Sequence, residues 1–213
     1  MTLAMTSRER GTPRFRGQSM TEFIIVLPVL LLLVLGAIQF GLVYHAKATL
    51  NLAAFEAARA GSLNMGKTEA MTLGLANGLR PLFTYDTDHG SVLRGFTIAN
   101  KKEARDYATI EVINPTGEAV ANWKGHIPND NLRYARDATP SGMSLQDANI
   151  LKIKITYCYP LQIFLLRNTI ITLLEAAGGA VDDFTQRCYK DFRLPIVAQG
   201  IVRMQSDYCP ACK

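Results

Sequence analysis

The chain has 213 residues, a formal net charge of +5, 48% hydrophobic residues and four cysteines. This length suits one modest domain plus a membrane segment, and the low mean hydropathy of +0.08 indicates that strongly apolar sequence is confined to part of the chain. The positive charge does not indicate nucleic-acid binding, because the sequence has no dense Lys/Arg patch with interleaved aromatic residues.

A basic leader, residues 1–17, precedes the apolar sequence. The junction reads Arg14-Phe15-Arg16-Gly17-Gln18-Ser19-Met20-Thr21-Glu22-Phe23. A carboxylate is unfavourable near hydrocarbon, so the position of Glu22 calls for a physical reason. Cleavage after Gly17 would expose an amine on Gln18, and the amine of a neighbouring subunit would then pair with Glu22 in an apolar setting. The alternative is that Glu22 simply extends to the membrane interface.

An uncharged apolar run extends from Phe23 to Tyr44, and Gln39 is its only strongly polar side chain. As a helix this run is about 33 Å long, which matches the hydrocarbon thickness of a bilayer. The leader carries four arginines against one glutamate, so the positive-inside rule places the N-terminus in the cytoplasm and the rest of the chain outside. A cleaved secretory signal peptide is the rival interpretation, but the run is too long and no clean small-x-small site follows it.

We expect one helix from Ser19 to Leu63, half in the membrane and half projecting as a stalk. Pro28 removes one backbone hydrogen bond and should bend this helix. Ala37 and Gly41 lie on one face and would let another helix approach closely, although small residues are also common apolar filler.

Beyond the apolar run the pattern becomes that of an amphipathic helix. Its predicted apolar face consists of Ala48, Leu52, Phe55 and Ala58. This helix should end at residues 64–66, and a second, short helix should follow from Thr68 to Leu79.

Strands are predicted in the second half of the chain, over Tyr107–Asn114, Ile150–Tyr159 and Ile196–Gln205, with Phe96–Asn100 as a candidate short edge strand. The middle strand is the clearest, because its isoleucines alternate with Lys and Thr. Gly200 weakens the third strand. Residues 114–144 are rich in Gly, Pro and Asn and should form a long surface loop.

The predicted fold class is α+β: a long N-terminal transmembrane and stalk helix, then a small antiparallel β-sheet head with covering helices. The predicted divisions are a removable leader (1–17), the helix (18–64) and an extracytoplasmic head (65–213). Within the head, the apolar segment Leu161–Leu174 is too short and too interrupted by Arg167 to be a second span. It is either a buried helix that covers the sheet or a surface for a partner or the membrane.

The four cysteines, Cys158, Cys188, Cys209 and Cys212, lie in the last quarter of the chain. Outside the cytoplasm they are expected to form disulfides, and of the three possible pairings we favour Cys158–Cys188 with Cys209–Cys212. The C-x-x-C spacing of the last pair also fits a redox motif, a metal site or free thiols. Redox activity needs a following helix to lower a thiol pKa, and the chain ends one residue later, so a structural disulfide is favoured.

Other chemical motifs are weak. The three histidines, His45, His89 and His126, lack metal-ligand spacing, and Asp86–Gly90 departs from the calcium-loop pattern. No catalytic residue, metal, cofactor or small-molecule substrate is therefore predicted.

The leader and helix resemble TadE-like minor pilins, or pseudopilins, of tight-adherence (Tad/Flp) pilus systems, and their junction resembles type IV-like prepilin signals. The similarity is densest over residues 16–64 and returns in Pro195–Gln205. The similar stretches are Arg16–Phe23, Leu27-Pro28, Leu35-Gly36, Gln39-Phe40-Gly41 and Ala53–Ala60.

This resemblance implies cleavage after Gly17 by a membrane aspartyl prepilin peptidase, with Glu22 and Phe23 in processing and assembly. It also implies a non-enzymatic protein of the bacterial inner membrane, with a periplasmic head. Its implied partners are the major pilin, other minor pilins and the pilus assembly platform, with which it builds adhesive fibres.

A second hypothesis is an uncleaved bitopic membrane protein with a periplasmic binding or thiol-redox domain. Rapid, selective alkylation of Cys209 and Cys212 after mild reduction would favour it.

Overall fold

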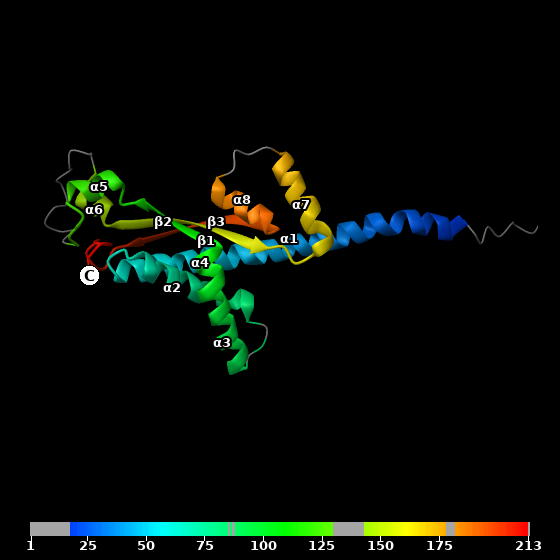
Figure 1. Ribbon diagram of the computed structural model, residues 1–213, viewed down its shortest axis with the longest axis horizontal. Coiled ribbons are helices and arrows are strands. Elements are labelled where there is room, and N and C mark those ends of the chain that lie inside the picture. The colour runs from blue at the N-terminus through cyan, green and yellow to red at the C-terminus, as the bar shows by residue number, and fades with distance from the viewer. Residues whose placement is uncertain (1–17, 85, 87, 130–142, 178–181, 213) are drawn as a thin grey trace, which may run out of the picture. The chain divides into compact units, whose positions relative to one another are not determined.

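The computed structural model describes residues 18–84, 86, 88–129, 143–177 and 182–212 (Figure 1). Its elements in chain order are α1 (Gln18–Leu63), α2 (Thr68–Leu79), η1 (Arg80–Phe83), α3 (His89–Ile98), η2 (Ala99–Glu103), α4 (Ala104–Asp106), β1 (Ala108–Asn114), α5 (Gly117–Asn122), α6 (Leu145–Ala148), β2 (Ile150–Pro160), α7 (Phe164–Ala176), α8 (Asp183–Lys190) and β3 (Arg193–Arg203). A long apolar helix followed by a small antiparallel sheet with helices confirms the predicted α+β class.

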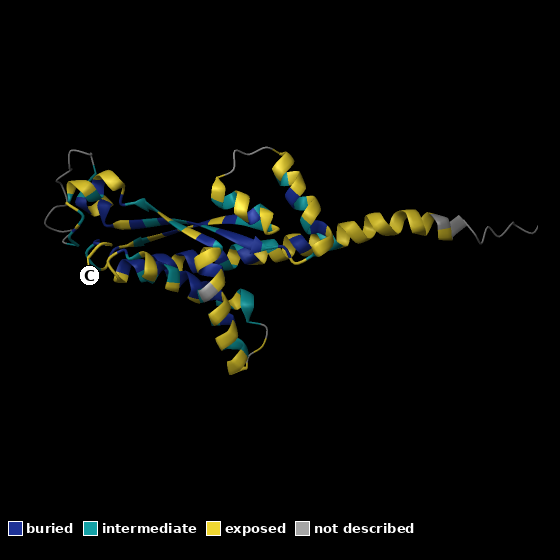
Figure 2. Ribbon diagram, viewed as in Figure 1, coloured by how far each residue is buried: buried dark blue, intermediate teal, exposed yellow. Residues whose placement is uncertain are grey.

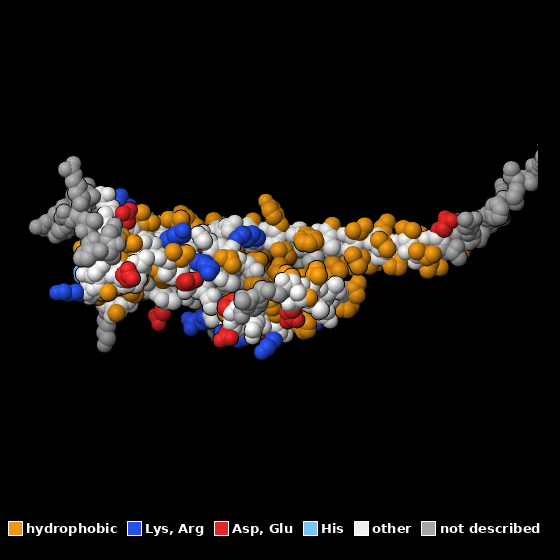
Figure 3. Space-filling view, turned by 90° about the horizontal axis from the view of Figure 1, so that it is seen from above, with side chains coloured by type: hydrophobic (Ala, Val, Ile, Leu, Met, Phe, Trp, Pro, Cys, Tyr) orange, Lys and Arg blue, Asp and Glu red, His pale blue; other side chains and the backbone are white. Residues whose placement is uncertain are grey.

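The described residues fall into two compact units, one ending at Ile38 and one beginning at Gln39. The first unit contains the apolar beginning of α1, whose large hydrophobic side chains are exposed along its length (Figures 2 and 3). Pro28 lies inside the helix, and the predicted bend there stays a prediction. The leader, residues 1–17, lies outside the described residues.

In the second unit, α1 packs on the head through an alanine-rich face. The buried residues of this face are Ala46, Leu50, Ala53, Ala54, Ala57 and Ala58. Their short side chains let neighbouring backbones approach closely, because a Cβ added at Gly78 of α2 or at Gly200 of β3 would collide with α1. Gly200 therefore permits the contact between β3 and α1, and it does not weaken the strand as predicted.

The apolar face predicted beyond the membrane run is not the face that packs on the head. Leu52 and Phe55 are exposed, as is Ala48, whereas Ala58 belongs to the buried face. Close packing against α2 and β3 requires small side chains, so the larger apolar side chains are left outside.

β2 is the central strand of the sheet, and β1 and β3 pair with it antiparallel on either side. The β2–β3 register is continuous from Ile150 opposite Arg203 to Pro160 opposite Arg193. The third strand therefore begins earlier than Ile196, where it was predicted to start. Alternate β2 side chains, Leu151, Ile153, Ile155 and Tyr157, are fully buried in the core shared with α1 and α2.

Two predictions for the middle of the chain are wrong. Residues 96–100 are not an edge strand, because α3 continues to Ile98 and a π-helical turn follows. Asp88 starts α3 by accepting a hydrogen bond from the Gly90 N–H at 3.1 Å.

Residues 114–144 are not one long loop either. Thr116 caps α5, its hydroxyl accepting from the Ala119 N–H at 3.3 Å, and Ile127 forms a β-bridge with Tyr208. Thr-Gly-Glu-Ala is a sequence typical of a helix N-terminus. The high Gly, Pro and Asn content of the surrounding stretch led to the prediction of a loop instead. Residues 130–142 lie outside the described residues.

The apolar segment 161–174 forms most of α7, and this helix is largely exposed (Figure 2). Leu166 and Ile171 are buried, whereas Phe164, Leu165 and Leu173 are exposed. The interpretation of this segment as a buried helix is therefore wrong.

Candidate assembly surface

Glu22 lies at the beginning of the apolar part of α1, and its side chain is exposed. Within the described part of the chain, the Glu22 carboxylate has no hydrogen-bond or ion-pair partner. Gln18 starts α1, and Gly17 lies outside the described residues. Phe23, next to the carboxylate, is exposed as well. Among residues 18–84 and the other described ranges, nothing therefore supplies the carboxylate with a counter-charge.

Within the second unit, a row of exposed apolar or small residues lies along one face of α1. These residues, which we call the α1 stripe, are Gly41, Tyr44, Ala48, Leu52 and Phe55. Their spacing of three or four residues keeps them on one side of the helix. Because the alanine-rich face is occupied by the head, the α1 stripe points away from the chain's own core.

Ala37 lies one helical turn before Gly41, and both are exposed. A Cβ at Gly41 would meet nothing within 4 Å, so no part of the described chain uses this position for close packing. The small pair is therefore open to another helix, although its proposed use stays a prediction.

Gln39 has a structural role that the sequence did not reveal. Its side chain is only 2% exposed, and its Oε1 accepts a hydrogen bond from the Ile163 N–H at 3.0 Å. This bond ties the start of α7 to α1. The sequence feature that could have indicated this role is the presence of a single strongly polar side chain within an otherwise apolar run.

A buried ion pair secures the sheet inside the head. The Arg193 guanidinium donates to both Glu103 carboxylate oxygens, at 2.7 and 3.2 Å, and the Tyr157 hydroxyl donates to Oε2 at 2.8 Å. Burial, reinforced by the Glu103 carboxylate, raises the pKa of Tyr157, so its hydroxyl stays protonated. Arg193 also lies over the Tyr107 ring, 3.5 Å from its centroid. The cluster holds η2, β2 and β3 together.

The cysteines form two disulfides, Cys158–Cys188 and Cys209–Cys212, which is the pairing favoured from the sequence. The first joins the central strand to α8. The second lies next to the α1–α2 turn, where the Cys209 N–H donates to the Met65 carbonyl at 3.0 Å.

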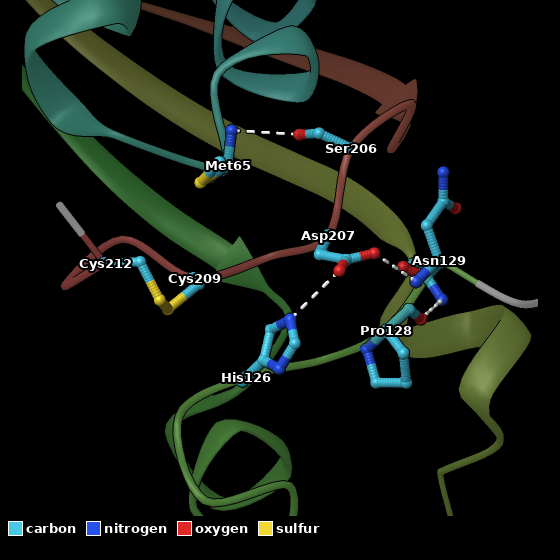
Figure 4. A network of polar contacts seen from close by, with 9 residues as sticks. Met65, His126, Pro128, Asn129, Ser206, Asp207, Cys209 and Cys212 are labelled. Atoms are coloured by element: carbon cyan, nitrogen blue, oxygen red, sulfur yellow. Dashed lines mark hydrogen bonds and ion pairs between the residues drawn. A yellow bond between two sulfur atoms is a disulfide. The ribbon is translucent and has the colours of Figure 1, made fainter.

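Polar contacts tie the C-terminal segment to two distant parts of the chain (Figure 4). The Met65 N–H donates to the Ser206 hydroxyl at 2.9 Å. One oxygen of Asp207 accepts from the Asn129 N–H at 2.8 Å, and the other lies 3.0 Å from Nε2 of His126. The bond from the Asn129 N–H and then the contact with His126 hold the pKa of Asp207 below its usual value.

Two general features bear on the class of protein. In the part of the chain that the structure describes, one helix, Glu22–Leu63, is long and apolar enough to cross a membrane, with a mean hydropathy of 2.8 over its most apolar window. No three His, Cys, Asp or Glu side chains among the described residues are placed to hold a metal ion.

Comparison with known proteins points to the same class. Residues 17–59 match a family model described as TadE-like protein, which confirms the resemblance over this segment. No curated protein and no solved structure matches the chain. The TadE-like match suggests a protein associated with a Tad pilus, and the long apolar helix fits a single-pass membrane protein.

Proposed function

We propose that this protein is a membrane-anchored minor pilin, or pseudopilin, that takes part in the assembly of a Tad-type adhesive pilus. The carboxylate of Glu22 stands at the start of an exposed apolar helix and has no partner within the described part of the chain, and this observation carries the proposal. The TadE-like match spans this carboxylate and the helix that follows it.

Processing would supply the missing counter-charge. A prepilin peptidase cleaves after Gly17, and Gln18 becomes the N-terminal residue with a positively charged amine. The amine of a neighbouring subunit pairs with Glu22, and the low dielectric of the apolar surroundings strengthens the attraction. This pairing gives a pilin-like subunit a register for lateral assembly without any catalytic step.

The α1 stripe supplies the remaining contact surface. An exposed row of apolar side chains on a helix is typical of a surface that another subunit covers. Ala37 and Gly41 let the partner helix approach closely, and Leu52 and Phe55 extend the contact toward the head. The major pilin and other minor pilins are the partners that this surface fits.

The proposed location follows from charge. The arginine-rich leader stays in the cytoplasm, α1 crosses the inner membrane, and the head lies in the periplasm or at the fibre surface. The pilus assembly platform then meets the protein at the membrane.

Replacing Glu22 tests the assembly role. Glu22→Ala removes the proposed counter-charge, so surface pili should be lost while the protein still inserts in the membrane at a normal level. Glu69→Ala is the matched control, because Glu69 is an exposed glutamate in the first turn of α2. Pilus counts by electron microscopy and protein levels in the membrane fraction provide the two readouts. Normal piliation with Glu22→Ala would contradict the role given to the carboxylate.

A further inference from the structure

The start of α7 is fixed at a defined height on α1. Gln39 accepts the hydrogen bond from the Ile163 N–H, and Gln39 precedes Tyr44, the last residue of the uncharged apolar run, by five positions. Because an α-helix rises 1.5 Å per residue, the contact lies about 7 Å before the C-terminal end of the apolar run. The N-terminal end of α7 therefore lies about 7 Å inside the end of the run, near the edge of the hydrocarbon.

The direction of α7 keeps the helix close to that level. In Figure 1, α7 runs across the direction of residues 39–63 of α1, which belong to the same unit, rather than along them. If α1 crosses the bilayer as proposed above, α7 therefore extends roughly parallel to the membrane plane.

The side chains of α7 are unusual for a helix in water. Phe164, Leu165 and Leu173 are 75%, 52% and 69% exposed. The helix has one basic residue, Arg167, which is turned inward so that its guanidinium lies 4.8 Å from the centroid of the Phe192 ring. The exposed side also carries the polar residues Asn168, Thr169 and Thr172, and it is uncharged except for Glu175 near its end.

Aromatic side chains on α1 mark the same level. Phe40 directly follows Gln39, Tyr44 lies about one turn further along α1, and both are exposed. Aromatic residues are enriched where membrane proteins cross the headgroup region. Phe164 adds a further exposed ring from α7 beside this position.

We propose that α7 is an interfacial helix, which lies on the outer surface of the bilayer with Phe164 and Leu165 seated in the headgroup region. The proposal rests on the membrane-spanning role of α1 in the proposed function. We assign lipid to this face because the Gln39–Ile163 hydrogen bond places the start of α7 near the edge of the bilayer hydrocarbon. Burial of 5–10 Å into the headgroup region is typical of such helices. The second attachment holds the head at a fixed height and rotation on the membrane.

Tryptophan quenching in nanodiscs tests this proposal on the full chain. Leu165→Trp is made in a Trp123→Phe background, which removes the chain's single tryptophan. The nanodiscs contain phosphatidylcholine brominated either near the headgroup end or near the terminal end of the acyl chains. Leu63→Trp is the matched control, because Leu63 is also a leucine that is 52% exposed, at the far end of α1. Leu33→Trp reports on the middle of the apolar run.

The emission of Leu165→Trp should fall by roughly half or more with bromines near the headgroup, and less with bromines near the chain ends. Leu63→Trp should be unaffected by either lipid. An unquenched Leu165→Trp beside a quenched Leu33→Trp overturns the interfacial helix but leaves the membrane span intact. A blue-shifted but unquenched emission would assign the α7 face to a second copy of the chain and overturn the proposal too. Loss of quenching at both positions would overturn the membrane span and the proposal with it.

Discussion

At the scale of single residues, the head depends on a charge pair that water hardly reaches. The side chains of Arg193 and Glu103 are 12% and 5% exposed. The Tyr157 hydroxyl also donates to Glu103, and Arg193 also donates to the Cys158 carbonyl. Removing one partner of a buried pair leaves an uncompensated charge, which is much less favourable than breaking an exposed pair. The cluster thus makes the position of β3 on β2 sensitive to a single side chain.

Glu103→Gln should lower the free energy of unfolding by about 3 kcal/mol, because the Arg193 charge stays buried without its counter-charge. Glu111→Gln is the matched control, since Glu111 forms an exposed pair with Lys154 at 3.2 Å, and its loss should change stability by less than about 1 kcal/mol. Urea unfolding of the full chain in detergent micelles measures both. Equal effects of the two substitutions would contradict the buried-pair account.

The tie between Asp207 and the Asn129 backbone should depend on pH. The pKa of Asp207 is lowered in the folded chain, so this carboxylate stabilises the fold above its ordinary value of about 4, and the stabilisation is lost as pH falls through the lowered folded value. The amide proton of Asn129 should report this transition by NMR between pH 5 and 2. Asp207→Asn should abolish the titration. A midpoint at or above 4 would show that the tie does not hold the charged form.

At the scale of elements, α1 holds the head together because one helical face is built for close approach. Gly74 and Gly78 place α2 against the alanines of α1, and Gly200 does the same for β3. A larger side chain at any of these glycines would push a backbone away from α1. The head is therefore assembled around the second half of the helix whose first half is apolar and exposed.

The two disulfides should contribute unequally to stability. Cys158–Cys188 spans 30 residues and Cys209–Cys212 spans three, so chain-entropy loss in the unfolded state predicts about 3–4 kcal/mol for the first and about 2 kcal/mol for the second. Replacing each pair by alanine and measuring urea unfolding of the full chain tests this order. A larger loss from the 209–212 pair would contradict it.

The regular elements could be predicted because their patterns are local. α2 occupies the predicted range, and the first two strands agree with prediction to within a residue. The face of α1 that packs could not be predicted, because large apolar residues and alanines compete for burial and only the tertiary contacts with Gly78 and Gly200 decide the outcome. The buried pair of Glu103 and Arg193 was also hidden, since its members are 90 positions apart.

The candidate assembly surface is visible in the sequence only in part. Glu22 stood out because a charge next to an apolar run is rare, and Ala37 with Gly41 stood out by spacing. That the stripe through Tyr44, Leu52 and Phe55 is left uncovered depends on where the head packs, which no local pattern contains.

At the scale of the whole molecule, one helix serves two environments. Its first part exposes an uncharged apolar surface, and its second part is the scaffold of a disulfide-bonded α+β head. This division suits a subunit that is held in a membrane and then engages neighbours through the same helix. In the proposed function, Gln18 becomes a charged N-terminus that pairs with Glu22 of a neighbouring subunit.

The most direct test is the mature N-terminus, determined by intact mass and terminal peptide mapping in cells with and without the prepilin peptidase. The account predicts a chain that starts at Gln18 when the peptidase is present and retains the leader when it is absent. A chain that keeps Met1 in both strains would contradict the account and favour an uncleaved bitopic membrane protein.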